Sequence, residues 1–298
     1  MIIEIRHKTT YRFLSPVQLG EHRLRIRPRD SFDLRILDSG LLVEPVAATS
    51  WLHDPYGNPV CKLDFGSEAV SSLTIESTLL IERWQSRRAT PGLAPWKPGC
   101  SVAYSDDERV ALASFMQPDA DAVDPAPGDF ALDAVLHSNP LTQHPLTAVS
   151  DRIHETIRYQ MRMEEGTQAP RRTMELASGA CRDMAWLFIA AARQLGYAAR
   201  FVTGYLHAPD PGHPADLGPD QHTHAWAEAY LPGDGWVEFD PTNRLVGDCS
   251  LVRVAVTRTP DEAVPVSGTF FGLPQRVSPV VKLAVEARQG MAAPPIAA

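Results

Sequence analysis

The segment Met184–Ala192 contains no polar residue, and it constrains the fold more than any other part of this chain. A helix that is apolar on every side has no face suited to water, so it belongs inside a hydrophobic core. Gly196 follows where a left-handed C-cap would end such a helix, and Arg193 complements the dipole of its last turn. We therefore expect a buried central helix with the rest of the domain packed around it.

Cys181 opens this predicted helix and is the first candidate for chemistry. A thiol at a helix N-terminus meets unpaired backbone N–H groups and the positive end of the helix dipole, and both favour the reactive thiolate. Such a position suits a nucleophile. A free cysteine is also one of the residues most often buried simply as a small hydrophobe, so position alone does not decide.

A second candidate, His224, lies in a stretch that alternates with period two. Ala225, Ala227 and Ala229 fall on one face, and His222, His224, Trp226, Glu228 and Tyr230 fall on the other. This pattern predicts a strand whose small-residue face packs closely, plausibly against the apolar helix.

Asp240 ends the next predicted strand, which follows the turn Leu231-Pro232-Gly233-Asp234. A hairpin of this kind would return Asp240 to the start of the preceding strand, beside His224. Pro241 then interrupts the ladder and leaves Asp240 at a strand end. Cysteine, histidine and aspartate in this order provide a nucleophile, a general base and a carboxylate that fixes the histidine tautomer.

These residues lie in three blocks that resemble the core of the transglutaminase-like superfamily. The blocks are Gly179-Ala180-Cys181-Arg182-Asp183, Thr223-His224-Ala225-Trp226-Ala227-Glu228 and Trp236-Val237-Glu238-Phe239-Asp240-Pro241-Thr242-Asn243, and Arg200–Leu206 between the first two is also similar. The resemblance implies a papain-like core with Cys181 as nucleophile, His224 as base and Asp240 as orienting carboxylate. Asp183 is expected to complement the helix dipole. Residues 248–260 depart from the family pattern, so a substrate contact made there in relatives is not expected here.

The first eighty or so residues resemble the amino-terminal β-domain of bacterial members, which are described as transglutaminase-like enzymes or cysteine proteases. The fold class is therefore expected to be α+β, with a papain-like transglutaminase core, a central apolar helix on an antiparallel sheet, after an all-β sandwich-like domain. The expected division is a β-domain over 1–85, an irregular connector with short helices over 86–145, the core with returning strands over 146–289, and a frayed tail over 290–298. Helices are expected near 108–116, 130–137 and 146–159, and the loop from His207 to Gln221 is expected to be mobile.

The net charge and the composition of the chain limit the kinds of partner that it is expected to bind. A formal net charge of −8 argues against nucleic acid, and no run reaches the ~18 apolar residues of a membrane span. The amino terminus lacks the apolar centre of a signal peptide, and the four cysteines show no short repeated spacing. We expect a cytoplasmic protein that acts without a cofactor or metal on a peptide, a protein or a small amide.

The leading interpretation is thiol-dependent acyl transfer on an amide bond through a thioester, ending in hydrolysis or transamidation, with a peptidase or amidase preferred. One alternative is a catalytically silent scaffold that keeps the fold and binds a partner. Another is a metal site formed by His207, His213, His222 and His224 with Cys181 or Asp240, although no recognised ligand spacing supports it.

Overall fold

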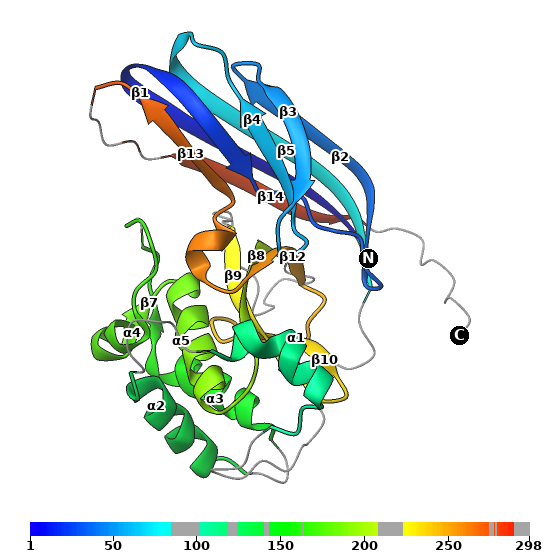
Figure 1. The fold of residues 1–298 in the computed structure, drawn as a ribbon, viewed down its shortest axis with the longest axis vertical. Coiled ribbons are helices and arrows are strands. Elements are labelled where there is room, and N and C mark those ends of the chain that lie inside the picture. The colour runs from blue at the N-terminus through cyan, green and yellow to red at the C-terminus, as the bar shows by residue number, and fades with distance from the viewer. Residues whose placement is uncertain are drawn as a thin grey trace.

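The described part of the chain forms two antiparallel sheets, a short parallel pair of strands and a group of helices (Figure 1). The computed structural model describes residues 1–84, 102–117, 124–139, 143–162, 164–207, 223–273, 277 and 279–288. The predicted loop after His207, the predicted tail over 290–298 and parts of the predicted connector lie outside the described residues.

The first sheet confirms the β-rich amino-terminal region. Its strands are β1 (Ile2–Leu24), β2 (Leu34–Glu44), β3 (Ala48–His53), β4 (Pro59–Asp64) and β5 (Ala69–Arg83), joined by β13 (Val266–Phe271) and β14 (Val280–Arg288). They form one antiparallel sheet in the order β2-β5-β1-β4-β3, with β13 and β14 paired to β1. The last two strands thus follow the second sheet in sequence but belong to the amino-terminal sheet.

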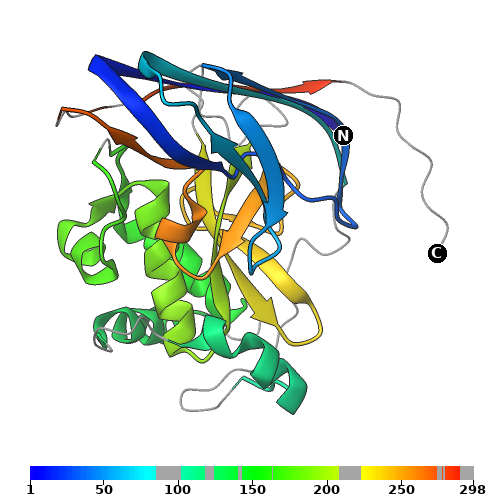
Figure 2. The ribbon, with the colours of Figure 1, turned by 45° about the horizontal axis from the view of Figure 1, so that its top comes forward.

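The second half of β1 buries a hydrophobic cluster with β4 and β5, as expected of a sandwich-like domain; its members include Val17, Leu19, Leu24, Leu63 and Ile75. In the first half of β1, alternate residues such as Ile3 and Ile5 are fully buried. They pack with Val252 and Tyr205 from the second sheet, so the core supplies the opposing layer. Figure 2 shows the amino-terminal strands lying across the top of the core.

The second sheet carries the candidate catalytic strands and has the order β11-β10-β9-β8-β12. Its strands are β8 (Ala199–Leu206), β9 (His224–Leu231), β10 (Gly235–Asp240), β11 (Leu245–Val246) and β12 (Leu251–Thr257). Neighbouring strands are antiparallel, and β9 and β10 form the predicted hairpin.

The apolar segment forms helix α5 (Cys181–Gln194), which is central as predicted. Its residues from Met184 to Ala192 are almost all fully buried, and they pack in one cluster with Ala225, Ala227 and Ala229 of β9. The small alanine side chains allow the helix to approach the sheet closely. Gly196 has the expected positive φ of 88° just after the helix.

In the described part of the chain, four further helices lie on the side away from the amino-terminal sheet (Figure 1), and the last three of them in sequence pack against α5. They are α1 (Asp106–Met116), α2 (Ala126–Leu136), α3 (Pro145–Thr156) and α4 (Pro170–Leu176), and a short 3₁₀ turn, η1 (Pro260–Ala263), precedes β13. The helix predicted over 146–159 ends earlier, at Thr156. Arg158–Tyr159 instead form a short strand, β6, parallel to β7 (Ser178–Gly179).

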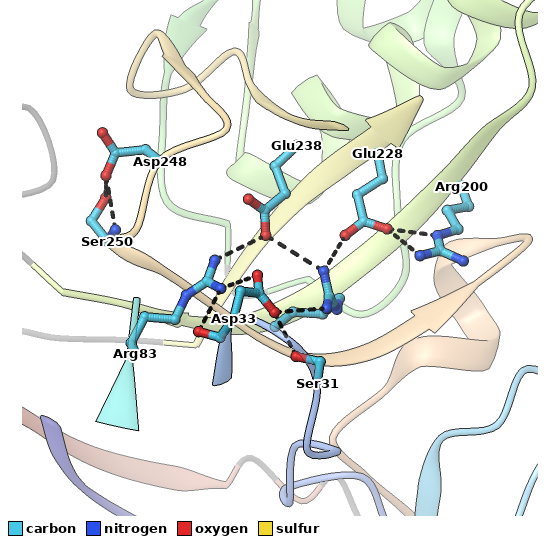
Figure 3. A network of polar contacts seen from close by, with 9 residues as sticks. Ser31, Asp33, Arg83, Arg200, Glu228, Glu238, Asp248 and Ser250 are labelled. Carbon is cyan, nitrogen blue, oxygen red and sulfur yellow. Dashed lines mark hydrogen bonds and ion pairs between the residues drawn. The ribbon is translucent and has the colours of Figure 1, made fainter. Parts of the chain in front are cut away.

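A buried network of charges joins the two sheets (Figure 3). Glu228 and Glu238 are paired directly across β9 and β10, an arrangement that is unfavourable for two like charges. Glu228 is fully buried and is bound by Arg200 at 2.6 Å and Arg253 at 2.9 Å. Its negative charge is therefore compensated at close range from β8 and β12.

Glu238 has weaker compensation than Glu228. Its nearest cations are Arg83 at 3.5 Å, from the amino-terminal sheet, and Arg253 at 3.7 Å. Arg83 makes its closest ion pair with Asp33, and Arg253 makes its own with Glu228. Burial therefore dominates over the attraction of these cations, and it raises the pKa of Glu238 to about 8.

Direct hydrogen bonds also connect the two sheets. The Asn58 side chain donates to the Val256 carbonyl at 2.7 Å and accepts from the Val256 N–H at 2.9 Å.

No helix in the described part of the chain has the length and apolar character needed to cross a membrane.

Candidate active site

Cys181 is the first residue of α5, and its side chain is half-buried. Ala180 precedes it in extended conformation and has no side chain that could cap the helix. A side chain from within the first turn stabilises the start of the helix instead, because Asp183 Oδ2 accepts the backbone N–H of Ala180 at 2.8 Å. The nucleophile candidate therefore stands in the first turn of a helix whose other end is buried in the core.

Asp183 does more than complement the helix dipole, the role expected for it. Its carboxylate is fully buried and accepts hydrogen bonds from Arg162 at 2.8 Å and from the backbone and side chain of Gln168 at 2.7 and 3.0 Å. Burial alone would raise the pKa of Asp183, but these donors together with Ala180 lower it. Asp183 thereby fixes the segment before α4 against the start of α5.

His224 is the first residue of β9 and is almost completely buried. Its Nε2 lies 2.8 Å from Asp240 Oδ2. The Trp226 ring stacks beside it, with ring centroids 6.0 Å apart and an interplanar angle of 24°. Because Nε2 contacts the carboxylate, Nδ1 is the ring nitrogen available to Cys181.

Asp240 ends β10 and is fully buried, directly before Pro241. Its Oδ1 accepts the backbone N–H groups of Thr242 at 3.0 Å and Asn243 at 3.4 Å. Its Oδ2 accepts the Asn243 side-chain amide at 2.7 Å. Desolvation favours the neutral acid, yet His224 and these donors hold the pKa of Asp240 below its usual value.

The electrostatics of the site favour a charged histidine. Burial on its own lowers the pKa of His224, but the Asp240 carboxylate and the hydrogen bond with Cys181 overcome it and raise the pKa to about 10. The same interaction places the Cys181 sulfur within hydrogen-bond reach of the ring. An imidazolium held against a sulfur atom is the arrangement that stabilises a thiolate nucleophile.

The structure brings together all three residues that the sequence selected, Cys181, His224 and Asp240. It adds two that the sequence did not single out. Asn243 belongs to the third block that resembles the family. Its position three residues after Asp240, beyond Pro241, is the sequence feature from which its place in the site could have been predicted. Tyr159 lies close to Cys181, since burial and then the charge of Cys181 raise the pKa of its phenol; no sequence pattern indicated this.

The metal alternative finds no support in the described residues, where no group of three or more His, Cys, Asp or Glu side chains is arranged to hold an ion. Two of the histidines invoked for it, His213 and His222, lie outside those residues. His224 itself is engaged by Asp240 and Cys181.

Comparison with known families gives two matches. Residues 134–241 match the transglutaminase-like superfamily, and residues 3–82 match the bacterial transglutaminase-like N-terminal region. The first range contains Cys181, His224 and Asp240. The second corresponds to the strands from β1 to β5.

Comparison with individual proteins gives similarity over nearly the whole chain. Uncharacterized proteins of Mycobacterium bovis and Mycobacterium tuberculosis are 26% identical over 277 residues, covering 90% of this chain and 87% of theirs. A crystal structure from Cytophaga hutchinsonii, described as a "putative cysteine protease", superposes with a TM-score of 0.72 at 22% identity. It covers 99% of this chain and 93% of its own, so the two share a fold.

Proposed function

Because the chain is a transglutaminase-like superfamily protein with a bacterial transglutaminase-like N-terminal region, we propose that it catalyses acyl transfer on an amide bond through a cysteine thioester. The observation that carries the proposal is the position of His224, buried between Asp240 and Cys181 with its pKa raised to about 10. This arrangement supplies a nucleophile, a proton donor and an orienting carboxylate in one place.

In the first half of the reaction, the Cys181 thiolate attacks the amide carbonyl carbon and forms a carbon–sulfur bond. The carbonyl oxygen becomes an oxyanion, which the backbone N–H of Cys181 at the helix N-terminus is placed to stabilise. The tetrahedral intermediate then collapses. The carbon–nitrogen bond breaks, and His224 gives its Nδ1 proton to the departing amine.

In the second half, a nucleophile attacks the thioester carbon while His224 accepts its proton, and the carbon–sulfur bond then breaks to release the Cys181 thiolate. Water gives a carboxylic acid and restores the free enzyme, whereas an amine gives a new amide. Asp240 remains ionised throughout and holds His224 in the orientation that directs Nδ1 to the sulfur. We favour hydrolysis, and thus a peptidase or amidase, because no feature of the described site suggests a second, amine-binding position.

The pH dependence of alkylation tests the nucleophile directly. The protein is treated with iodoacetamide across a range of pH, and each cysteine is followed by peptide mass spectrometry. Cys181 should react at acidic pH, and His224→Ala should remove this reactivity. Cys61 and Cys249 serve as internal references, because burial raises the pKa of both thiols, with Asp248 contributing at Cys249.

Turnover gives the second part of the test. A screen of fluorogenic amides should yield a substrate whose hydrolysis is lost in Cys181→Ala, while the circular dichroism of that variant stays that of the wild type. Adding a primary amine distinguishes transamidation by the mass of the product. A folded protein whose Cys181 is no more reactive than an ordinary accessible thiol would overturn the proposal and favour a binding scaffold.

A further inference from the structure

Asn243 occupies a position that the chemistry described so far does not use. Its side chain is only 8% exposed, and its amide nitrogen lies 2.7 Å from Asp240 Oδ2 and 3.3 Å from His224 Nε2. Together with the contact between His224 Nε2 and Asp240 Oδ2, these distances place the three polar groups in a closed triangle.

The turn after β10 brings this amide back to the carboxylate. The backbone N–H groups of Thr242 and Asn243 both point to Asp240 Oδ1, which fixes one oxygen of the carboxylate. The Asn243 side chain then binds the other oxygen. With both oxygens held, the carboxylate plane cannot rotate, and the direction from which it meets the imidazole is set.

Backbone conformation does not explain the presence of asparagine at this position. Asparagine is favoured in turns because it tolerates the left-handed region, but the left-handed residue of this turn is Arg244, with φ 56°. The Asn243 amide, by contrast, is buried and aimed at the two side chains of the candidate site. Its contacts therefore concern Asp240 and His224 rather than the path of the chain.

We propose that Asn243 is a positioning residue, which locks the Asp240 carboxylate and through it the orientation of His224 toward Cys181. This inference rests on the proposed function. A loose carboxylate would let the imidazole ring turn away from the sulfur, and the thiolate–imidazolium pair would be less stable. Asn243 thereby sets how much of Cys181 is reactive at acidic pH.

The test uses two variants with different structural risks. Asn243→Ala removes the amide and leaves a small space, whereas Asn243→Leu removes the amide and keeps the volume. Arg244→Ala is the matched control. It changes the neighbouring residue, whose half-exposed side chain pairs with Asp151 at 2.9 Å outside the site.

The measurement is the rate of Cys181 alkylation by iodoacetamide at acidic and at alkaline pH in each folded variant. The Asn243 variants should lose about ten- to a hundredfold of the acidic rate, the size of effect seen when a hydrogen-bond partner that orients a metal-bound histidine is removed. Their alkaline rate should equal that of the wild type, because there the thiolate forms without the pair. Arg244→Ala should match the wild type at both.

Two negative results are distinguishable. If wild-type Cys181 shows no acidic reactivity, the proposed function itself fails. If the wild type is reactive but the folded Asn243 variants keep the same ratio of acidic to alkaline rate, the positioning role is refuted and the asparagine only completes the turn.

Discussion

Replacing Glu238 by glutamine should remove a pH-dependent loss of stability without harming the protein near neutrality. Glu238 lies in the charge network between the two sheets, and its nearest cations form closer ion pairs with Asp33 and Glu228 (Figure 3). Its pKa is raised from 4.5 to about 8, mainly because it is buried. The folded protein therefore holds a proton on Glu238 that the unfolded chain has already released.

The sign and size of the effect follow from this difference. A carboxyl group whose pKa is higher in the folded state contributes its full stability below the unfolded value of 4.5 and loses it as pH rises to about 8. Each pH unit within this window costs about 1.4 kcal/mol. Glu238 should thus lower the free energy of unfolding by about 3 kcal/mol between pH values of about 6 and about 9.

Urea denaturation of the wild type and of Glu238→Gln at these two pH values measures the effect. Glutamine has the shape of the protonated acid, so the variant should match the wild type at the lower pH and exceed it by about 3 kcal/mol at the higher. Glu228→Gln is the matched control on the opposite strand. It removes the negative charge that compensates Arg200 and Arg253, and should destabilise at both pH values by about 3 kcal/mol or more. An equal pH dependence in Glu238→Gln and the wild type would refute the reasoning.

Three further outcomes are expected from single changes. Asp240→Asn should keep the fold but reduce turnover on the order of 10⁴-fold by favouring the wrong tautomer of His224; a loss below tenfold in a substrate assay would contradict its role. Asp183→Ala should lower the free energy of unfolding by about 3 kcal/mol, because Arg162 is left without its buried carboxylate, and thermal unfolding checks this. Gly204→Ala should destabilise by about 1–3 kcal/mol, since a Cβ there would overlap the Val252 carbonyl and the Trp226 ring. Gly66→Ala, with open space around it, is the comparison for Gly204 in the same unfolding assay, and equal midpoints would argue against the overlap.

Local patterns predicted the parts of the site that lie on single elements. The apolar run from Met184 to Ala192 predicted helix α5 and its burial, and the alanines of β9 predicted the face that receives it. The turn between β9 and β10 then predicted that Asp240 would return to His224, which the distance of 2.8 Å confirms. These features depend on periodicity and short-range turns, which are visible in the sequence.

Features that depend on contacts between residues far apart in the chain could not be predicted from the sequence. Strand β14 pairs with β1 from the other end of the chain, and no local pattern specifies that partner. Likewise, the sequence shows Glu238 only as one polar residue of a predicted strand. It does not show that Arg83, from the other sheet, lies beside its carboxylate. The role of Asn243 depends on the direction of one amide, which the family motif contains but does not explain.

Because of the order in which its partners are translated, strand β1 has one unpaired edge during most of the synthesis of the chain. Residues from Ile2 to Thr10 of β1 are bonded to β5 along one edge and to β14 along the other. The partner on the first edge is translated early, but the partner on the second edge leaves the ribosome only after the whole transglutaminase-like core. Until then the nascent chain carries a long, open strand edge, which is a template for association with other chains. Premature termination before Val280 would make that edge permanent, so incomplete copies of this protein should aggregate even where their transglutaminase-like core has folded.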